Sequence, residues 1–429
     1  MGLFAFLRRI LFGAPEDAAD DGGSTAPRQS PPPQSPATAR RRRTPLPPLR
    51  YGSKHPRTPA ALEQVAERPY QFANLGPAGR FLDLSTDADL SRLEQLELPR
   101  LLTPADVAHW LNMPPGRLAW LSGRFEPQQR AASEKAAHYH YRWIRKRSGG
   151  MRLIEAPKVR LRQVQTRILR EILDHVAAHD HAHGFVRDRS ALTNAKPHVG
   201  SYVVLKLDLE NFYASVRYSR VVAIFRALGF SRAAALWLAR LTTSAAPASL
   251  SFPDRSPLGL LPYLPRHLPQ GAPTSPALAN LSAWSLDVRL TGLAKKYHAT
   301  YTRYADDLTF SGSHRFAAAL SEFIPLAEKI IRSERFKVNR AKRKVLRRSG
   351  RQTVTGVVTN ARPNIAREDY DRLKAILHNC VRRGPSTQNH DSRKDFQAHL
   401  RGRVAHVRSV HPARGAKLLA LYQRIDWKR

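Results

Sequence analysis

Hydrophobic and polar residues alternate along the chain with two different spacings, and the spacing predicts the type of secondary structure. Residues 139–157 (YHYRWIRKRSGGMRLIEAP) contain two extended runs on either side of a Ser-Gly-Gly turn, which predicts a β-hairpin. Residues 159–177 carry aliphatic side chains every three or four positions, which is typical of an amphipathic helix. Residues 202–209 (YVVLKLDL) are the clearest candidate for a buried strand.

Helix and strand patterns alternate after this strand. Residues 211–228 and 274–296 predict helices, and residues 299–311 (ATYTRYADDLTFS) predict two strands joined by a tight turn. Residues 246–269 are rich in proline and predict a long loop. Elements in this order favour an α+β domain with a mostly antiparallel sheet.

Helical patterns flank this central region on both sides. Thr103 followed by Pro104 predicts a helix start, and a second apolar group follows at residues 118–121. We interpret these helices as a lead-in packed on the next domain, with a DNA-reading helix-turn-helix as the alternative. Beyond residue 359, apolar stripes predict further helices whose basic side chains either contact phosphates or are simply solvated, namely Arg372, Lys374, Arg382 and Arg383.

The first 90 residues differ in composition from the rest of the chain. Residues 13–60 hold 11 of the 32 prolines and almost no large aliphatic side chains, so they cannot bury enough surface to offset the entropy of ordering. We expect a mostly disordered extension, in which the arginine run at residues 40–43 either contacts nucleic acid or is solvated. Residues 1–12 form either a short amphipathic helix or a frayed end and are too short to cross a bilayer, so we expect no transmembrane segment.

The charge of the chain narrows the classes of function. There are 71 Lys and Arg residues against 34 Asp and Glu residues, so the formal net charge is +37. Such an excess requires a polyanionic partner, and nucleic acid is the first candidate because its phosphates recur at short intervals. The single cysteine, Cys380, cannot form an internal disulfide bond, which agrees with the cytoplasmic location that we expect.

Three carboxylates are candidate metal ligands. Asp306 and Asp307 are adjacent at the predicted hairpin turn, and Asp208 lies near the end of the predicted buried strand. Mg²⁺ binds a few carboxylates together with water and substrate phosphates, which suits three aspartates and a polyanionic substrate. Two such ions about 4 Å apart activate an attacking hydroxyl and stabilise the leaving oxygen in phosphoryl transfer. A pair of ordinary turn aspartates is the alternative.

Motifs around these aspartates resemble those of reverse transcriptases and occur in that family's order over residues 135–360. Tyr304-Ala305-Asp306-Asp307 fits the Tyr-x-Asp-Asp box, and Asp208 is followed five residues later by an aromatic residue. The resemblance implies catalysis and Mg²⁺ binding by the three aspartates. It also implies nucleotide binding by residues of the fingers hairpin, the sugar gate, the Pro-Gln-Gly motif and the Asn-x-x-Lys motif, namely Lys146, Arg152, Tyr213, Gln270, Gly271 and Lys342.

Two further motifs resemble those of retron reverse transcriptases. Residues 194–198 (NAKPH) fit an Asn-Ala-x-x-His motif, and residues 354–356 fit a Val-Thr-Gly motif. The resemblance implies RNA-directed DNA synthesis on a cognate structured non-coding RNA, which serves as template and primer, with dNTPs as substrates. It further implies a branched RNA-linked DNA product (msDNA) with an RNA–DNA hybrid, and a role in phage defence with a linked effector protein. The residues implied in RNA binding are Asn194, His198, Val354, Thr355 and Gly356.

The resemblance also implies a right-hand polymerase fold and a division of the chain. Residues 1–90 would be the extension, 91–134 the helical lead-in, 135–358 the fingers and a palm with a ferredoxin-like sheet, and 359–429 a helical RNA-binding thumb. The alternatives are another bacterial lineage, of intron-encoded, diversity-generating or abortive-infection type, or a non-enzymatic RNA-binding scaffold. Four histidines at residues 175–183 (HVAAHDHAH) suggest a metal site, with ordinary family sequence as the alternative.

Overall fold

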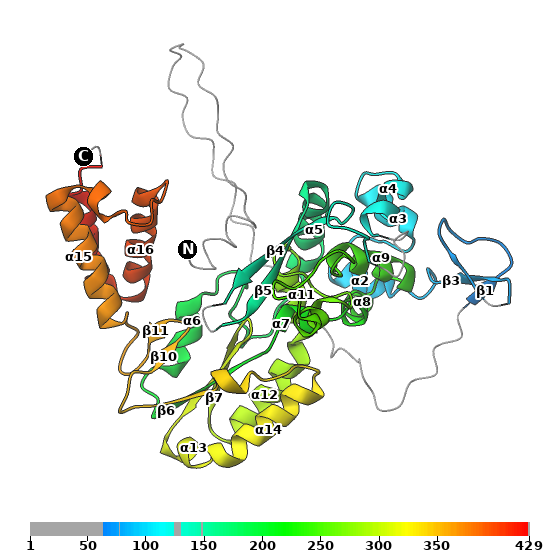
Figure 1. The fold of residues 1–429 in the computed structure, drawn as a ribbon. Helices are drawn as coiled ribbons and strands as arrows, with labels where there is room; N and C mark the ends of the chain where they lie inside the picture. Colours follow the sequence, from blue (N-terminus) through cyan, green and yellow to red (C-terminus); the bar gives the residue numbers. More distant parts are fainter. Residues whose placement is uncertain (1–62, 77, 124–129, 147–148, 428–429) are drawn as a thin grey trace, which may run out of the picture. The chain divides into compact units, whose positions relative to one another are not determined.

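The computed structural model describes residues 63–76, 78–123, 130–146 and 149–427, which fold into two compact units. The first unit holds the described residues up to Ala177 together with Val216–Leu278, and the second holds Ala178–Ser215 and Ala279–Arg429. Helix α11 (Ser275–Ser282) contains the point where the chain passes from the first unit to the second. Both units mix helices with antiparallel strands, as the α+β prediction expected (Figure 1).

The first unit contains the predicted hairpin, made of β4 (Tyr139–Arg145) and β5 (Met151–Pro157), which pair along their whole length. Helix α5 (Val159–Glu171) follows it, and its buried aliphatic side chains confirm the predicted amphipathic face. The helix is shorter than expected, because Ile172 leaves helical geometry and a 3₁₀ turn takes over at Leu173–His175.

The remaining helices of the first unit precede and follow this hairpin and helix in the sequence. The lead-in helices are α2 (Leu90–Gln95), α3 (Pro104–Trp110) and α4 (Pro115–Leu121), and Thr103 caps α3 as predicted. Helix α3 packs against α9 (Arg232–Thr242). The predicted helix 211–228 divides into α7 (Phe212–Ser215), in the second unit, and α8 (Tyr218–Ala227).

Extended backbone at residues 216–217 separates α7 from α8. The proline-rich loop contains short helical segments. Arg217 forms a β-bridge with His267 and the amide of Leu268 donates to Val216 O, so the backbone at residues 216–217 cannot be helical. Residues 246–269 include α10 (Pro257–Leu260) and a 3₁₀ turn at Leu261–Tyr263.

Three short strands lie in the region that the sequence assigned to the extension. They are β1 (Glu63–Val65), β2 (Asn74–Leu75) and β3 (Phe81–Asp83), with β3 in the middle of the antiparallel sheet. The hydroxyl of Tyr70 accepts a hydrogen bond from the amide of Leu84 at 3.2 Å, which ties the loop to the sheet. The arginine run at residues 40–43 and the apolar segment at residues 1–12 lie outside the described residues.

A four-stranded antiparallel sheet forms the centre of the second unit, in the order β7-β8-β6-β9. Its strands are β6 (Val203–Asp208), β7 (Thr300–Tyr304), β8 (Asp307–Gly312) and β9 (Lys344–Arg347). Helices α12 (Trp284–Lys296) and α14 (Leu320–Ser333) pack together, and α12 packs against β7 (Figure 1). The predicted helix 274–296 is interrupted at Ala283, between α11 and α12.

The end of the chain adds a second hydrophobic core to this unit. Its helices are α15 (Arg367–Arg383), α16 (Phe396–Val410) and α17 (Pro412–Gln423), as the apolar stripes beyond residue 359 predicted. Their buried aliphatic residues join side chains of α6 (Ala191–Ala195) and of the hairpin formed by β10 (Thr353–Val354) and β11 (Val357–Val358). Within the described residues, no helix has the length and apolar character needed to cross a membrane.

Candidate active site

The fold brings the three candidate aspartates to one end of the four-stranded sheet. Asp208 is the last residue of β6 and Asp307 is the first residue of β8, and the two face each other in the antiparallel register. Directly opposed side chains on such strands have Cβ atoms about 4.5–5.5 Å apart. Asp306 lies in the β7–β8 turn, and its carbonyl oxygen accepts a hydrogen bond from the amide of Leu209 at 2.9 Å.

Two lysines neutralise this acidic end. Lys342 Nζ lies 3.1 and 3.0 Å from the two carboxylate oxygens of Asp208, and Lys206 Nζ lies 2.9 Å from Asp307 Oδ2. Lys342 ends a 3₁₀ turn at Arg340–Lys342 that is tied to the strand, because the amide of Asn339 donates to Asp208 O at 2.7 Å. The structure therefore brings Lys342 to the aspartates, where the Asn-x-x-Lys motif predicted a role for it.

The ionised form of the Asp307 carboxyl is disfavoured despite the two lysines. Burial raises the pKa of the Asp307 carboxyl, the charge of Asp208 raises it further, and Lys206 and Lys342 only partly oppose the increase. Among the described residues, no three His, Cys, Asp or Glu side chains form a complete metal cage. The donor set nevertheless fits Mg²⁺, which takes few carboxylates and completes its coordination with water and substrate phosphates.

The turn that carries Asp306 has an unusual backbone. Tyr304 pairs with Asp307, so Ala305 and Asp306 form a two-residue turn, and Ala305 has a φ of 56°. Positive φ at this first turn position is usual for glycine and costs about 1–2 kcal/mol for other residues. Gly184 lies against the turn so closely that a Cβ there would be 2.5 Å from Ala305 N.

A buried ion pair that was not predicted from the sequence holds this turn in place. Arg303 and Asp287 are both fully buried, and Arg303 donates to Asp287 from Nε at 2.8 Å and from Nη2 at 2.7 Å. Arg303 Nη1 also donates to Asn280 Oδ1 at 3.0 Å and to Ala305 O at 3.1 Å. Burial alone would lower the pKa of the Arg303 guanidinium, but the charge of Asp287 reverses the effect and the pKa is raised.

A further hydrogen bond connects this ion pair to Gly184. Asn280 Nδ2 donates to Gly184 O at 2.9 Å, so one amide side chain joins Arg303 to the segment that packs on the turn. The signal in the sequence was an arginine within a predicted strand, since a charge that becomes buried requires a partner. We call Asp287, Arg303, Asn280 and Gly184 the turn bracket.

The aromatic residues after Asp208 have different surroundings. Phe212 is buried, packs in a tilted arrangement against Phe336 at a centroid distance of 5.6 Å and lies under the guanidinium of Arg303. Tyr213 is half-buried. Of the two rings, Tyr213 is thus the more accessible one; its role as the sugar gate, which the five-residue spacing from Asp208 favours, stays a prediction.

Four of the predicted nucleotide-binding residues lie in the first unit. Lys146 and Arg152 are at the two sides of the β4–β5 turn, where the Lys146 amide donates to Gly150 O at 2.9 Å. Gln270 is half-buried and Gly271 is buried with a φ of 137°. Gln270 O accepts a hydrogen bond from the Glu155 amide at 3.0 Å, so the Pro-Gln-Gly loop lies beside strand β5.

The residues implied in RNA binding form a packed cluster with one exposed tip. His198 is fully buried between Ser311 Oγ and Thr302 Oγ1, each 2.7 Å from a ring nitrogen. Asn194 and Val354 are also buried, so these three side chains pack inside the unit and do not offer a surface to RNA. Gly356 is exposed and Thr355 half-buried with a φ of 47°, and Thr355 Oγ1 donates to Ala191 O at 2.9 Å. RNA contact at this turn stays a prediction.

The histidine cluster shows structural contacts. His183 Nδ1 lies 3.0 Å from Thr193 Oγ1, and the ring of His179 packs edge-on against Trp284. Burial lowers the pKa values of His179 and His183, the latter to about 4. These contacts agree with the interpretation of this segment as ordinary family sequence.

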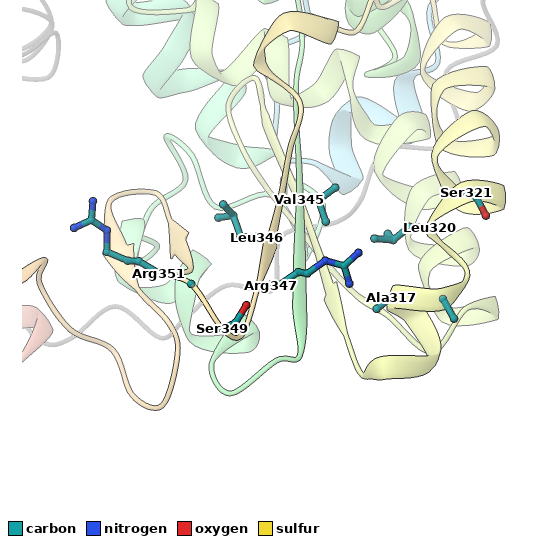
Figure 2. A pocket seen from close by; sticks show the side chains of 10 residues that line it. Ala317, Leu320, Ser321, Val345, Leu346, Arg347, Ser349 and Arg351 are labelled. Atoms are coloured by element: carbon teal, nitrogen blue, oxygen red, sulfur yellow. The ribbon is translucent and has the colours of Figure 1, made fainter.

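A pocket of about 790 Å³ lies beside strand β9 (Figure 2). Its lining comes from α13 (His314–Ala318), the start of α14, β9 and the turn that follows. Arg347 and Arg351 contribute basic side chains to its lining. None of the predicted site residues lines this pocket.

Comparisons with known proteins agree with the geometry. Residues 144–371 match the family model described as reverse transcriptase (RNA-dependent DNA polymerase). The retron Mx65 reverse transcriptase of Myxococcus xanthus is 41% identical over 77% of this chain and 73% of its own length. The retron Mx162 enzyme of the same organism is 32% identical over 84% of this chain and 76% of its own length. A Candida albicans telomerase structure covers 66% of this chain and 56% of its own, at 11% identity and a TM-score of 0.38, too low to bear on the fold.

The chain therefore belongs to the reverse transcriptase family and is an RNA-directed DNA polymerase. The family as a whole uses divalent metal ions. Within the family, the similarity to retron enzymes over most of both chains identifies a polymerase of retron type.

Proposed function

We propose that this polymerase carries out nucleotide addition at Asp208, Asp306 and Asp307, within a palm that belongs to a right-hand fold. The observation that carries the proposal is the register of β6 and β8, which sets Asp208 opposite Asp307 at the sheet end where the turn presents Asp306. Three carboxylates at one strand end, next to Lys342, give the donor set that phosphoryl transfer requires.

The other motif residues would then have roles in handling the nucleotide. Tyr213 would close the position of the sugar 2′-hydroxyl, since it is the accessible ring after Asp208. Lys342 would hold a proton for the leaving pyrophosphate, and its Nζ already lies within 3.1 Å of Asp208. Lys146 and Arg152 would meet the triphosphate, and the loop at Gln270 and Gly271 would line the base and sugar.

Mg²⁺ is the divalent ion that we propose for the site, as two ions held by Asp208, Asp306 and Asp307. When bound, it would supply charge neutralisation for the attacking hydroxyl and the leaving oxygen. The raised pKa of Asp307 supports a cation at this place, because a cation would stabilise the ionised carboxylate that burial disfavours.

The partner that we propose is a cognate structured RNA, copied into branched msDNA, and the last three helices would be the RNA-binding thumb. Exposed basic residues on α15 support this role, namely Arg372, Lys374, Arg382 and Arg383. Burial lowers the pKa of Arg403 on α16, Asp369 opposes the change, and the charges of Arg372 and Arg393 add to it. Arginines crowded in this way are stabilised by a bound phosphate. Antiphage defence with a linked effector protein is part of the same proposal.

Substitution of the turn aspartates tests the catalytic assignment. The variant Asp306→Asn/Asp307→Asn should lose at least about 10³-fold in primer extension with dNTPs, an order of magnitude typical of lost charge stabilisation, and should still bind RNA. Asp180→Asn is the matched control, since the Asp180 side chain is 96% exposed. Undiminished synthesis by the double variant would refute the assignment.

The RNA partner is tested by sequencing the nucleic acid that copurifies with the full chain. The proposal predicts one RNA species joined to DNA through a branch, absent from the Asp306→Asn/Asp307→Asn preparation. Recovery of an unbranched, unrelated RNA would contradict the msDNA proposal without affecting the assignment of the aspartates.

A further inference from the structure

A second buried pair of charged side chains lies in the first unit, next to the Pro-Gln-Gly loop. Glu155 of β5 and His267 are both fully buried, and Glu155 Oε2 lies 2.8 Å from His267 Nε2. The two residues are 112 positions apart in the sequence. Neither has a role in the reaction described above.

The contacts of His267 fix the proton arrangement of the pair. His267 Nδ1 lies 2.8 Å from Pro265 O, and because a carbonyl oxygen only accepts, Nδ1 must carry hydrogen and donate. The Nε2–Oε2 contact then contains one proton, held either by a charged imidazole facing a carboxylate or by a carboxylic acid facing a neutral imidazole. In both forms the pair is neutral overall, which allows its complete burial.

Both residues of this pair are connected to the loop that contains Gln270 and Gly271. The backbone of Glu155 binds the loop directly, because its amide donates to Gln270 O at 3.0 Å. His267 comes three residues before Gln270, and its own backbone exchanges two hydrogen bonds with Ser244, at 2.8 and 2.9 Å. Gly271 fits tightly against the same strand, since a Cβ there would be 3.0 Å from Glu155 O.

Strand β5 therefore carries two functions at once. Arg152 lies near its start and is proposed to meet the triphosphate, whereas Glu155 fixes the loop that contains Gln270. One oxygen of Glu155, Oε1, is buried and has no hydrogen-bond partner among the described residues. A buried acceptor left unsatisfied costs stability, so its retention next to a binding loop requires a reason beyond packing.

We propose that Glu155 and His267 are positioning residues that set the Gln270–Gly271 loop against strand β5 and thereby determine dNTP affinity. They do not touch the nucleotide. Their effect passes through the Glu155 amide, the Gln270 carbonyl and the tight contact at Gly271. The inference rests on the proposed nucleotide-binding role of Gln270 and Arg152.

Two conservative variants of Glu155 separate side-chain length from charge. Glu155→Gln keeps the length, and its amide can donate to a neutral His267 Nε2, so the KM for dNTP should stay within about twofold of wild type. Glu155→Asp keeps the charge but is one methylene shorter and cannot maintain the 2.8 Å contact. We expect its KM for dNTP to rise about tenfold with kcat changed less than about threefold, because a shifted loop weakens binding more than chemistry.

The experiment is steady-state primer extension by the full chain on an RNA template with a DNA primer, with dNTP as the varied substrate. Gln165→Leu is the matched control, because Gln165 is a buried polar residue of the same unit whose amide donates to Tyr139 and Leu241 O, away from the loop. It should lower the melting temperature without changing the KM for dNTP. A Glu155→Asp enzyme with wild-type KM would overturn the inference, including one whose apparent kcat falls at unchanged KM, as a loss of folded enzyme would cause.

Gln270→Ala distinguishes a failure of this inference from a failure of the proposed function. If Gln270→Ala raises the KM for dNTP and Glu155→Asp does not, the loop binds nucleotide and the pair does not position it. If Gln270→Ala leaves the KM unchanged, the proposed role of the loop is wrong, and a rise in Glu155→Asp would then also count against positioning through Gln270.

Discussion

The turn bracket gives a prediction that separates stability from catalysis. Arg303 and Asp287 are fully buried and joined by two charge-assisted hydrogen bonds of 2.7 and 2.8 Å. Replacing Arg303 with Met leaves the Asp287 carboxylate buried without its cation. Breaking a buried pair in this way costs about 3–5 kcal/mol. For a unit of this size that corresponds to a decrease of about 10 °C in melting temperature.

The double variant Arg303→Met/Asp287→Asn tests the origin of that loss. Each single variant leaves one uncompensated charge, whereas the double variant leaves none, so it should be no less stable than either single variant. The asparagine side chain introduced by Asp287→Asn still offers an oxygen to the hydroxyl of Tyr301, which in the wild-type protein donates to Asp287 at 2.8 Å. Urea denaturation of the four proteins gives the coupling free energy, which we expect to be about 2–3 kcal/mol.

Primer extension by the same proteins measures the second effect. The double variant lacks the bonds from Arg303 to Asn280 and Ala305 O, so the turn with Asp306 should stay misplaced and activity should stay at least about 100-fold low despite the recovered stability. Arg351→Met is the control, because its pair with Glu368 is exposed and contributes less than about 1 kcal/mol. Two results would contradict the reasoning. One is a loss of less than about 1 kcal/mol in the free energy of unfolding of each single variant, and the other is a loss in the double variant that equals the sum of the two single losses.

Three further predictions concern other parts of the second unit. Burial, with a smaller effect of His183, lowers the pKa of His198 from 6.5 to about 3. The unfolded chain therefore binds a proton below pH 6.5 that the folded chain does not, and stability should fall by about 2 kcal/mol between pH 7.5 and pH 5. In urea denaturation, His198→Gln should lack this part of the pH dependence, and an unchanged slope would count against the explanation. Gly184→Ala should abolish primer extension, because its Cβ would lie 2.5 Å from Ala305 N, whereas Gly402→Ala, with open space around it, should keep full activity; equal activity of the two variants would disprove the packing argument. Arg382→Gln/Arg383→Gln should weaken RNA binding and make the salt dependence of log K shallower by about one for each phosphate that is no longer bound, as measured by filter binding at several salt concentrations; an unaltered slope would exclude these residues from the RNA interface.

Local sequence patterns predicted the elements whose turns and faces are determined by neighbouring residues. The hairpin at 139–157, the strand near 202–209 and the strand-turn-strand at 299–311 all occur in the structure. The breaks at residues 216–217 and at Ala283 were missed, and the first of them depends on backbone pairing with His267, which is distant in sequence. The strands at residues 63–83 are only two or three residues long, which is too short for a periodic pattern to indicate them.

In the candidate site, too, the sequence predicted residues that belong to local motifs, but it did not predict side-chain pairs between residues that are distant in the sequence. The motifs predicted the aspartates and Lys342, and the fold brings Asp208, Asp307 and Lys342 together. The two buried pairs could not be assigned from the sequence, because Arg303 and Asp287 are 16 residues apart and Glu155 and His267 are 112 apart. Buried His198 shows the converse, since a residue of a recognised motif can pack inside the protein.

The buried acidic residues and the exposed basic residues should respond differently to salt. In a chain of net charge +37, Asp287 and Glu155 are fully buried and each is paired with one basic side chain, in one case next to the turn that carries Asp306 and in the other next to the Pro-Gln-Gly loop. Buried pairs are screened little by salt, whereas exposed arginines such as Arg382 and Arg383 are screened strongly. Raising the salt concentration should therefore weaken RNA binding while kcat on saturating template stays nearly constant. Under the proposed function, the excess positive charge would hold the RNA, and the buried carboxylates of Asp287 and Glu155 would fix the geometry in which it is copied.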